Sequence, residues 1–205
     1  MFVKICGITR VTDAVHAVQQ GATAVGFVFW PASPRCVTPE RAAEIIGELP
    51  SSVMVVGVFV NETLDGIRTM AARVGLSAIQ LHGDEPPAFA EAIAWPVLKS
   101  VTLASAADAC AAWPADTTLL LDAADPERRG GTGVAVDWQG AAAVACTRRV
   151  VLAGGLTPSN VVEAITTVRP FGVDVSSGVE ESPGVKSLDK VTQFLANARQ
   201  AFEKR

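Results

Sequence analysis

The sequence predicts a (β/α)8 barrel, and three observations point to it. Eight apolar runs alternate with eight helical segments along the chain. Several runs are continuous in Val, Ile and Leu, which is typical of a parallel sheet covered on both faces. The 205 residues leave about 25 for each strand–helix unit, near the lower size limit of this fold. A doubly wound open sheet is the structural alternative, but eight evenly spaced units favour closure.

The expected strands are short apolar runs, and Gly7 ends the first of them. They are Phe2–Cys6, Thr23–Phe29, Val53–Val60, Ala78–His82, Val97–Val101, Thr117–Leu121, Arg149–Ala153 and Gly172–Val175. No linker or change in composition divides the chain, so we expect one barrel domain over residues 1–205.

The expected helices carry apolar residues at helical spacing. They are Asp13–Gln20, Pro39–Leu49, Glu62–Val74, Pro86–Ala94, Ala106–Ala112, Trp138–Ala145, Pro158–Val168 and Leu188–Glu203. Thr38-Pro39 and Thr157-Pro158 each place a cap residue before a proline at the first helical position. Asn61, Asp84 and Asp137 are the expected caps of three further helices.

The composition excludes several classes of protein. A net charge of −4 gives no electrostatic footprint for nucleic acid. No apolar stretch is long enough to cross a bilayer, and no signal peptide is visible at the N-terminus. Four scattered cysteines and two distant histidines lack metal-ligand spacing, so we expect reduced thiols, a cytoplasmic setting and no metal.

Two glycine-containing loops follow the last two expected strands. Gly154 and Gly155 would let the backbone approach an anion, and a helix N-terminus comes next. Ser177 and Gly178 offer a hydroxyl and a backbone amide after the last strand. The glycine pair alone could simply form a tight turn, but the loops after strands seven and eight are the usual phosphate site of such barrels.

Cys6 and Asp122 are the expected acid–base groups at the barrel mouth. Cys6 closes the first strand, where a thiol can act as base or nucleophile. Asp122 follows the sixth strand, and the next helix starts too late for Asp122 to cap it. The glycine-rich segment 123–136, which separates Asp122 from the next helix, suggests a flap that closes over a ligand.

Three other residues after the strands could hold a ligand. Arg35, in the loop after the second strand, could clamp a carboxylate, although a solvated surface arginine is the commoner case. Gln80 and His82 share one face of the fourth strand and could donate hydrogen bonds into the mouth. A lone histidine is more often structural, so His82 ranks below Cys6 and Asp122.

Taken together, these motifs resemble one family strongly, the phosphoribosylanthranilate isomerases of tryptophan biosynthesis. The resemblance rests on residues 4–9, 26–29 with 33–35, 56–61, 80–83, 121–122 with 130–133, 152–156 and 172–180. It implies an Amadori rearrangement of N-(5-phosphoribosyl)anthranilate, with Asp122 as general acid and Cys6 as general base. Arg35 would hold the anthranilate carboxylate, and we place Gln80, His82 and Asp174 with it among the substrate-binding residues.

The chemistry implied by the resemblance needs no cofactor. Asp122 would protonate the ribose ring oxygen, and Cys6 would then remove the proton beside the resulting Schiff base. The Cys6 thiolate requires a lowered pKa or a nearby cation. Lys4 and Asp174 lie on strands that barrel closure makes neighbours, so we expect them to form a buried ion pair beneath the site.

Other functions remain open at this point. A pentose-phosphate epimerase would need metal ligands around the mouth, and a histidine-pathway isomerase would, by resemblance, use paired aspartates. Acceptance of both aminoaldoses is not excluded by the residues. The alternative from another class is a binding protein that keeps the phosphate loops without catalysis. The expected partner is a small phosphosugar, and the chain is expected to be a monomer or a homodimer.

Overall fold

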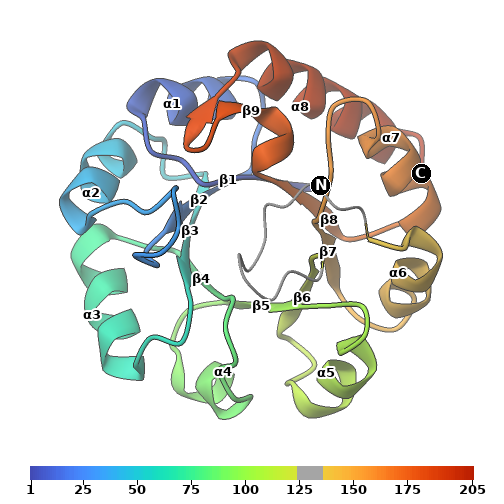
Figure 1. Cartoon of the computed structure of the whole chain (residues 1–205), viewed down its shortest axis with the longest axis horizontal. Coiled ribbons are helices and arrows are strands. Elements are labelled where there is room, and N and C mark those ends of the chain that lie inside the picture. Colours follow the sequence, from blue (N-terminus) through green and yellow to red (C-terminus); the bar gives the residue numbers. More distant parts are fainter. Residues whose placement is uncertain (124–135) are drawn as a thin grey trace.

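Eight parallel strands form a closed barrel in the computed structural model, which describes residues 1–123 and 136–205 (Figure 1). The first strand pairs with both the second and the eighth, which closes the sheet. The strands are β1 (Phe2–Cys6), β2 (Ala24–Val28), β3 (Met54–Phe59), β4 (Ala78–Leu81), β5 (Val97–Val101), β6 (Thr118–Leu121), β7 (Val150–Leu152) and β8 (Gly172–Val175). The (β/α)8 prediction is therefore confirmed.

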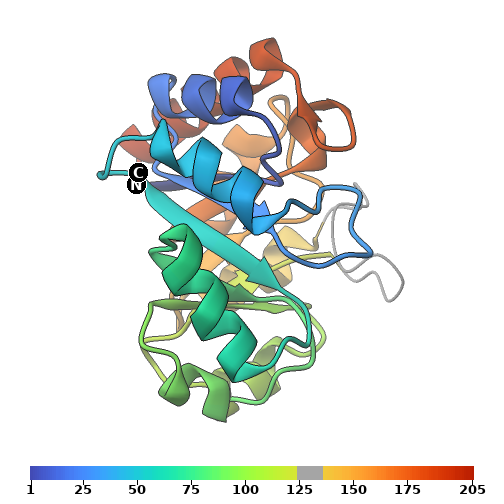
Figure 2. The same ribbon diagram turned by 90° about the vertical axis from the view of Figure 1, so that its left-hand side faces the viewer.

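A ring of helices surrounds the barrel (Figure 1). These helices are α1 (Val11–Gln19), α2 (Pro39–Gly47), α3 (Leu64–Val74), α4 (Ala88–Ala92), α5 (Ala106–Ala112), α6 (Trp138–Ala145), α7 (Val161–Val168) and α8 (Leu188–Glu203). The two termini lie at one end of the barrel, and the loop after β2 lies at the other (Figure 2). No helix in the described part of the chain is long and apolar enough to span a membrane.

Side chains fill the barrel interior in layers. Apolar residues of seven strands form the layer at the amino-terminal end of the strands, with Phe2 of β1 among them. Above it lies Lys4, which is fully buried, and then Cys6 at the mouth, where it packs with Val28 and Val58. This alternation follows from the two-residue period of β1.

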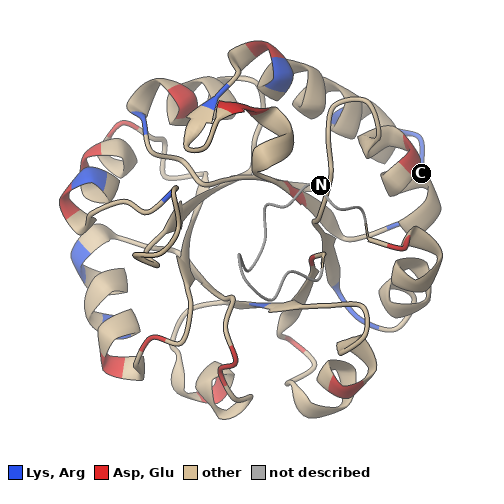
Figure 3. Ribbon diagram, viewed as in Figure 1, with Lys and Arg blue, Asp and Glu red and all other residues tan. Residues whose placement is uncertain are grey.

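Charged residues of both signs lie on the outer helices and loops (Figure 3). The eight barrel strands carry only Lys4, Lys99 and Asp174. Lys99 faces the helix layer, where it contacts the ring of Trp113. Lys4 and Asp174 are therefore the charged strand residues inside the barrel, a position that requires them to pair.

The predicted caps are only partly correct. Thr38 accepts a hydrogen bond from the Arg41 amide and Asp137 accepts one from the Gln139 amide, as expected. Asn61 and Asp84 do not cap helices: Thr63 caps α3, and α4 begins after Pro87. Asn61 and Asp84 instead bond to each other across the loops after β3 and β4.

The last helix is preceded by structure that the sequence pattern did not predict. A turn of 3₁₀-helix, η1 (Ser177–Val179), follows β8, and a small antiparallel hairpin, β9 (Glu180–Ser182) with β10 (Val185–Lys186), follows η1. Strands of three and two residues are too short to produce a recognisable period. The hairpin lies over the β1 side of the barrel (Figure 1).

Arg148 anchors the connection between α5 and β6. Its guanidinium donates hydrogen bonds to four carbonyls, of Cys110, Trp113, Pro114 and Thr117, at 2.6–3.3 Å. We expect Arg148→Met to lower the free energy of unfolding by about 2–4 kcal/mol, because it leaves several carbonyls without a donor. Urea denaturation measures this.

Arg73→Met, at an exposed position of α3, is the matched control and should stay within about 0.5 kcal/mol of wild type. Equal stability of the Arg148 and Arg73 variants would show that the carbonyl contacts contribute nothing net.

Candidate active site

The predicted site residues all lie at or just beyond the carboxyl ends of the barrel strands. Cys6 ends β1, Arg35 lies in the loop after β2, and Gln80 and His82 lie in and after β4. Asp122 follows β6, Gly154 and Gly155 follow β7, and Asp174 lies in β8 with Ser177 and Gly178 in η1. This end of a (β/α)8 barrel is where active sites form.

Lys4 and Asp174 form the expected buried ion pair. The Lys4 Nζ lies 3.0 Å from each Asp174 carboxylate oxygen. The two residues are register partners in the β1–β8 pair. Lys4 is fully buried and the Asp174 side chain is 8% exposed, so the carboxylate reaches only the floor of the mouth.

Cys6 lies directly above this pair. Burial raises the pKa of the Cys6 thiol, and the Asp174 carboxylate raises it further, while the positive charges of Lys4 and Lys186 oppose the shift. The pKa of Cys6 ends above its ordinary value, not below it as a resting thiolate would require. The thiol therefore keeps its proton at neutral pH in the absence of substrate.

A series of polar contacts runs from β4 to Asp122. Gln80 Nε2 lies 2.9 Å from His82 Nδ1. An amide nitrogen donates, so His82 Nδ1 accepts and its proton lies on Nε2. That Nε2 lies 3.3 Å from Ser100 Oγ and 3.5 Å from Asp122 Oδ2. His82 therefore faces the carboxyl group expected to be the acid.

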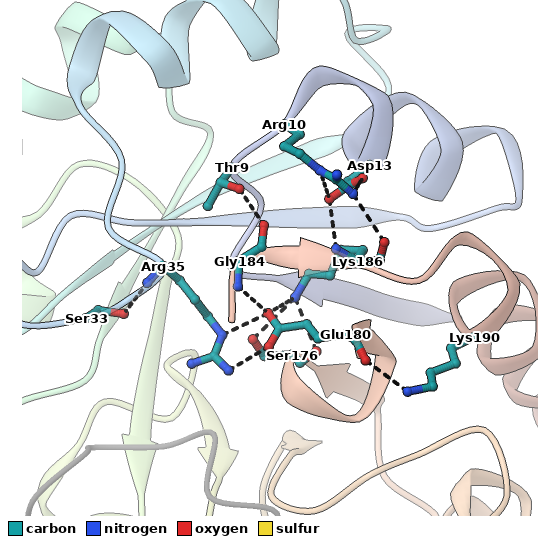
Figure 4. Close-up of polar contacts among 10 residues, drawn as sticks. All are labelled: Thr9, Arg10, Asp13, Ser33, Arg35, Ser176, Glu180, Gly184, Lys186 and Lys190. Carbon is teal, nitrogen blue, oxygen red and sulfur yellow. Dashed lines mark hydrogen bonds and ion pairs between the residues drawn. The ribbon is translucent and has the colours of Figure 1, made fainter. Parts of the chain in front are cut away.

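Arg35 is held by a residue to which sequence reasoning gave no role. The loop after β2 returns to that strand, where Val37 N donates to Val28 O at 3.0 Å. The Arg35 guanidinium donates from Nε and Nη2 to the two carboxylate oxygens of Glu180, at 2.9 and 2.7 Å (Figure 4). It is thus neither solvated nor unpartnered. Glu180 lies 145 positions from Arg35 in the sequence. The sequence signal for Glu180 was its place in the motif of residues 172–180.

The loops after β7 and β8 contact each other. Gly154 and Gly155 both have positive φ, +71° and +65°, which disfavours side chains there. Gly178 packs directly on the carbonyl of Leu156, leaving no room for a Cβ. The two loops predicted to share a phosphate therefore form one continuous surface.

Asn160 stabilises the glycine loop. Its Oδ1 accepts from the Thr157 amide at 2.8 Å and its Nδ2 donates to the Gly155 carbonyl at 2.9 Å. The prediction that Thr157 caps a helix starting at Pro158 is wrong, because Asn160 holds 157–160 as a turn and α7 starts at Val161. The sequence signal was available, since asparagine often bonds to nearby backbone in turns.

Glu85 organises the loop that carries His82. It accepts hydrogen bonds from the amides of Gly83 and Asn61 and pairs with Lys99 Nζ at 2.8 Å. A hollow of about 630 Å³ opens beside this loop, between His82, Asp122 and Trp113. Asp122 lines this hollow, whereas Cys6 does not. The flap predicted over 123–136 lies, apart from its end residues, outside the described residues.

A (β/α)8 barrel with a thiol, a carboxyl group, a guanidinium and a glycine-lined double loop around its mouth defines an enzyme class, the barrels that act on small phosphorylated substrates. A family profile described as N-(5'-phosphoribosyl)anthranilate (PRA) isomerase matches residues 3–197. The chain belongs to this isomerase family.

Relatives and solved structures agree with this assignment. The N-(5'-phosphoribosyl)anthranilate isomerase of Geobacter sp. (strain M21) is 48% identical over 199 residues, 96% of this chain and 97% of that protein. The phosphoribosyl anthranilate isomerase of Thermotoga maritima is 44% identical, with a TM-score of 0.91 over 98% of this chain and 99% of its own. An isomerase solved in complex with reduced 1-(o-carboxyphenylamino)-1-deoxyribulose 5-phosphate is 43% identical, with a TM-score of 0.87 over the same shares.

Proposed function

We propose that this chain catalyses the Amadori rearrangement of N-(5-phosphoribosyl)anthranilate to 1-(2-carboxyphenylamino)-1-deoxyribulose 5-phosphate, a step of tryptophan biosynthesis. The observation that carries the proposal is the placement of Cys6 and Asp122 at the carboxyl ends of β1 and β6 of one closed barrel. Membership of the isomerase family supports the same reaction.

The first step opens the sugar ring. Protonated Asp122 gives its proton to the ring oxygen while the bond between that oxygen and C1 breaks. The lone pair of the anthranilate nitrogen forms a C=N bond to C1, giving a Schiff base. His82 Nε2, 3.5 Å from Asp122 Oδ2, fixes the direction in which the carboxyl group points.

The second step moves the double bond. In the fraction of molecules whose Cys6 thiol has lost its proton to solvent, the thiolate removes the proton from C2, and the C–H electrons form a C1–C2 double bond as the C=N electrons return to nitrogen. The resulting enolamine becomes the ketone when the C2 hydroxyl loses its proton and C1 gains one. No electrons leave the substrate, so the chain needs no redox partner or cofactor for this scheme.

Three other groups bind the substrate in this proposal. Arg35, next to Cys6, takes the anthranilate carboxylate, and the joined loops of Gly154, Gly155, Ser177 and Gly178 take the phosphate. At the floor of the mouth, the substrate is hydrogen-bonded or oriented by Gln80, His82 and Asp174. The glycine geometry supports the phosphate assignment, because backbone amides that approach closely suit an anion.

Two experiments test the function. The gene should restore growth without tryptophan to a strain lacking this isomerase, and purified protein should convert the aminoaldose to the ketose. Folded protein that binds but does not convert the substrate would favour the non-catalytic binding protein. An assay with the histidine-pathway aminoaldose decides whether the chain accepts both substrates.

We expect Gly178→Ala to raise the KM for the phosphorylated substrate about tenfold, because overpacking typically costs about 1–3 kcal/mol. The added methyl group would push η1 off the Leu156 carbonyl and separate the two phosphate loops. Steady-state kinetics with inorganic phosphate as competitor measures this. Gly47→Ala, where a Cβ meets nothing within 4 Å, is the control. An unchanged KM and phosphate inhibition constant would remove Gly178 from the phosphate site.

The cytoplasm is the proposed location, which the four cysteines without disulfides support. A solved relative is described as generated monomers of the dimeric phosphoribosylanthranilate isomerase of Thermotoga maritima, 42% identical with a TM-score of 0.87 over 98% of this chain and 99% of that one. A monomer or a homodimer is accordingly proposed here, and light scattering of the purified protein separates the two.

A further inference from the structure

Glu180, the first residue of β9, is the centre of a buried ion network (Figure 4). Besides the two bonds from Arg35, its Oε1 accepts from Lys186 Nζ at 2.8 Å and from the Gly184 amide at 3.2 Å. The side chains of Arg35, Glu180 and Lys186 are 13%, 5% and 0% exposed. Charges withdrawn this far from water must be held in fixed positions to be tolerated.

The network ties three rim loops together. Thr9 Oγ1, after β1, donates to the Gly184 carbonyl in the hairpin turn (Figure 4). Gly7, with φ +73°, packs so closely that a Cβ there would lie 2.5 Å from Arg35 Cδ. Arg35 is therefore held between the residue that follows Cys6 and the β9–β10 hairpin.

Glu180 occupies only one of the two hydrogen-bonding edges of the Arg35 guanidinium. Nε and Nη2 form the edge that binds Glu180, and Nη1 makes no hydrogen bond to residues 1–123 or 136–205. An arginine has two such edges, so the Nη1–Nη2 edge remains for a second carboxylate.

The charge balance explains why Lys186 is present. Glu180 alone would cancel the charge of Arg35. With Lys186 in its charged form, the buried groups around Cys6 are three cations (Lys4, Arg35 and Lys186) and two carboxylates (Asp174 and Glu180), which leaves one positive charge. Burial lowers the pKa of Lys186, and the Glu180 carboxylate opposes that shift. The mouth therefore still attracts an anion.

We propose that Glu180 and Lys186 are positioning residues that hold Arg35 beside Cys6 with one edge open to the carboxylate of the substrate. Resting on the proposed function, this assigns the β9–β10 hairpin to recognition of the anthranilate half of the substrate. A pre-ordered arginine avoids the entropy loss of ordering a long side chain upon binding.

The test compares two substrates, N-(5-phosphoribosyl)anthranilate and its aniline counterpart, which lacks the carboxylate. Glu180→Gln should raise the KM for the anthranilate substrate about 10- to 100-fold, with kcat within about threefold, because the charge-assisted pair that orders Arg35 is lost. Lys186→Met should also raise the KM for the anthranilate substrate, because Glu180 would then cancel the charge of Arg35. The KM for the aniline substrate should change less than about threefold in either variant. Glu181→Gln, the exposed neighbour in β9, is the control and should match wild type with both substrates.

An equal loss with both substrates would overturn the proposal, because it would mean general damage to the mouth. The Glu180→Gln/Lys186→Met double variant covers the case in which a single variant does not fold, since it removes both buried charges together. It should show the same selective loss for the carboxylate-bearing substrate.

An NMR measurement separates this inference from the proposed function. The Arg35 Nε–H signal should be protected from solvent exchange in wild type and in Glu181→Gln, and should lose that protection in Glu180→Gln. Wild-type protein inactive on both substrates would reject the proposed function alone. An Arg35 signal unaffected by Glu180→Gln would reject the positioning role whatever the activity.

Discussion

Cys6→Ala and Asp122→Asn are each expected to lower kcat by about 10²–10⁴-fold, the usual contribution of a general base or acid. Cys6→Ala removes the group that takes the C2 proton, and Asp122→Asn removes the proton donated to the ring oxygen. Both variants should still bind a product analogue, because Arg35 and the phosphate loops are untouched. Near-wild-type turnover in either variant would exclude that residue from catalysis.

The pH dependence offers a second test of Cys6. A base acts only when deprotonated, so in the Asp122→Asn background, where no acid titrates beside Cys6, the residual kcat/KM should rise with pH, about tenfold per unit, until it passes the pKa of Cys6. Because burial raises that pKa, the rise should continue beyond the ordinary range of a thiol. Lys4→Met should move the rise to still higher pH, since the positive charge of Lys4 lowers the pKa of Cys6.

Lys4→Met should also have the largest effect on stability. It leaves the Asp174 carboxylate buried without its partner, and breaking a buried ion pair typically costs about 3–5 kcal/mol. Urea unfolding followed by circular dichroism measures the loss.

The double variant Lys4→Met/Asp174→Leu is the informative comparison. Replacing both charges by apolar side chains should recover much of the stability, because neither residue is then an unpaired charge. If Lys4→Met alone were as stable as wild type, water would have to reach the Asp174 carboxylate and hydrate it in place of Lys4. A stable double variant that remains inactive would show that the pair serves the site and not the fold.

The barrel was predictable because its signals are local. Each strand is a short apolar run, and the end of one strand needs no knowledge of the others. Even the Lys4–Asp174 pair followed from the sequence, because barrel closure dictates that β1 meets β8 and the two-residue period dictates which side chains face inward.

What the sequence did not reveal depends on distant partners. Glu180 lies in a motif, but nothing local shows that its carboxylate reaches back to Arg35. The direction of the Cys6 pKa shift depends on how far burial and Asp174 outweigh Lys4 and Lys186, and these charged residues lie in three elements, β1, β8 and β10. Competition between local bonds explains the misplaced start of α7, because Asn160 bonds to the backbone of Thr157 and Gly155 and holds as a turn the residues expected to begin the helix.

The pairing of β1 with β8 also constrains how this protein can be made in the cell. Lys4 leaves the ribosome well before its partner Asp174, which is translated 170 positions later. Until then its ammonium group has to stay hydrated, so the first strand cannot settle into the interior. The barrel can therefore close only after β8 has been synthesised, which leaves the earlier strands exposed to chaperones until then.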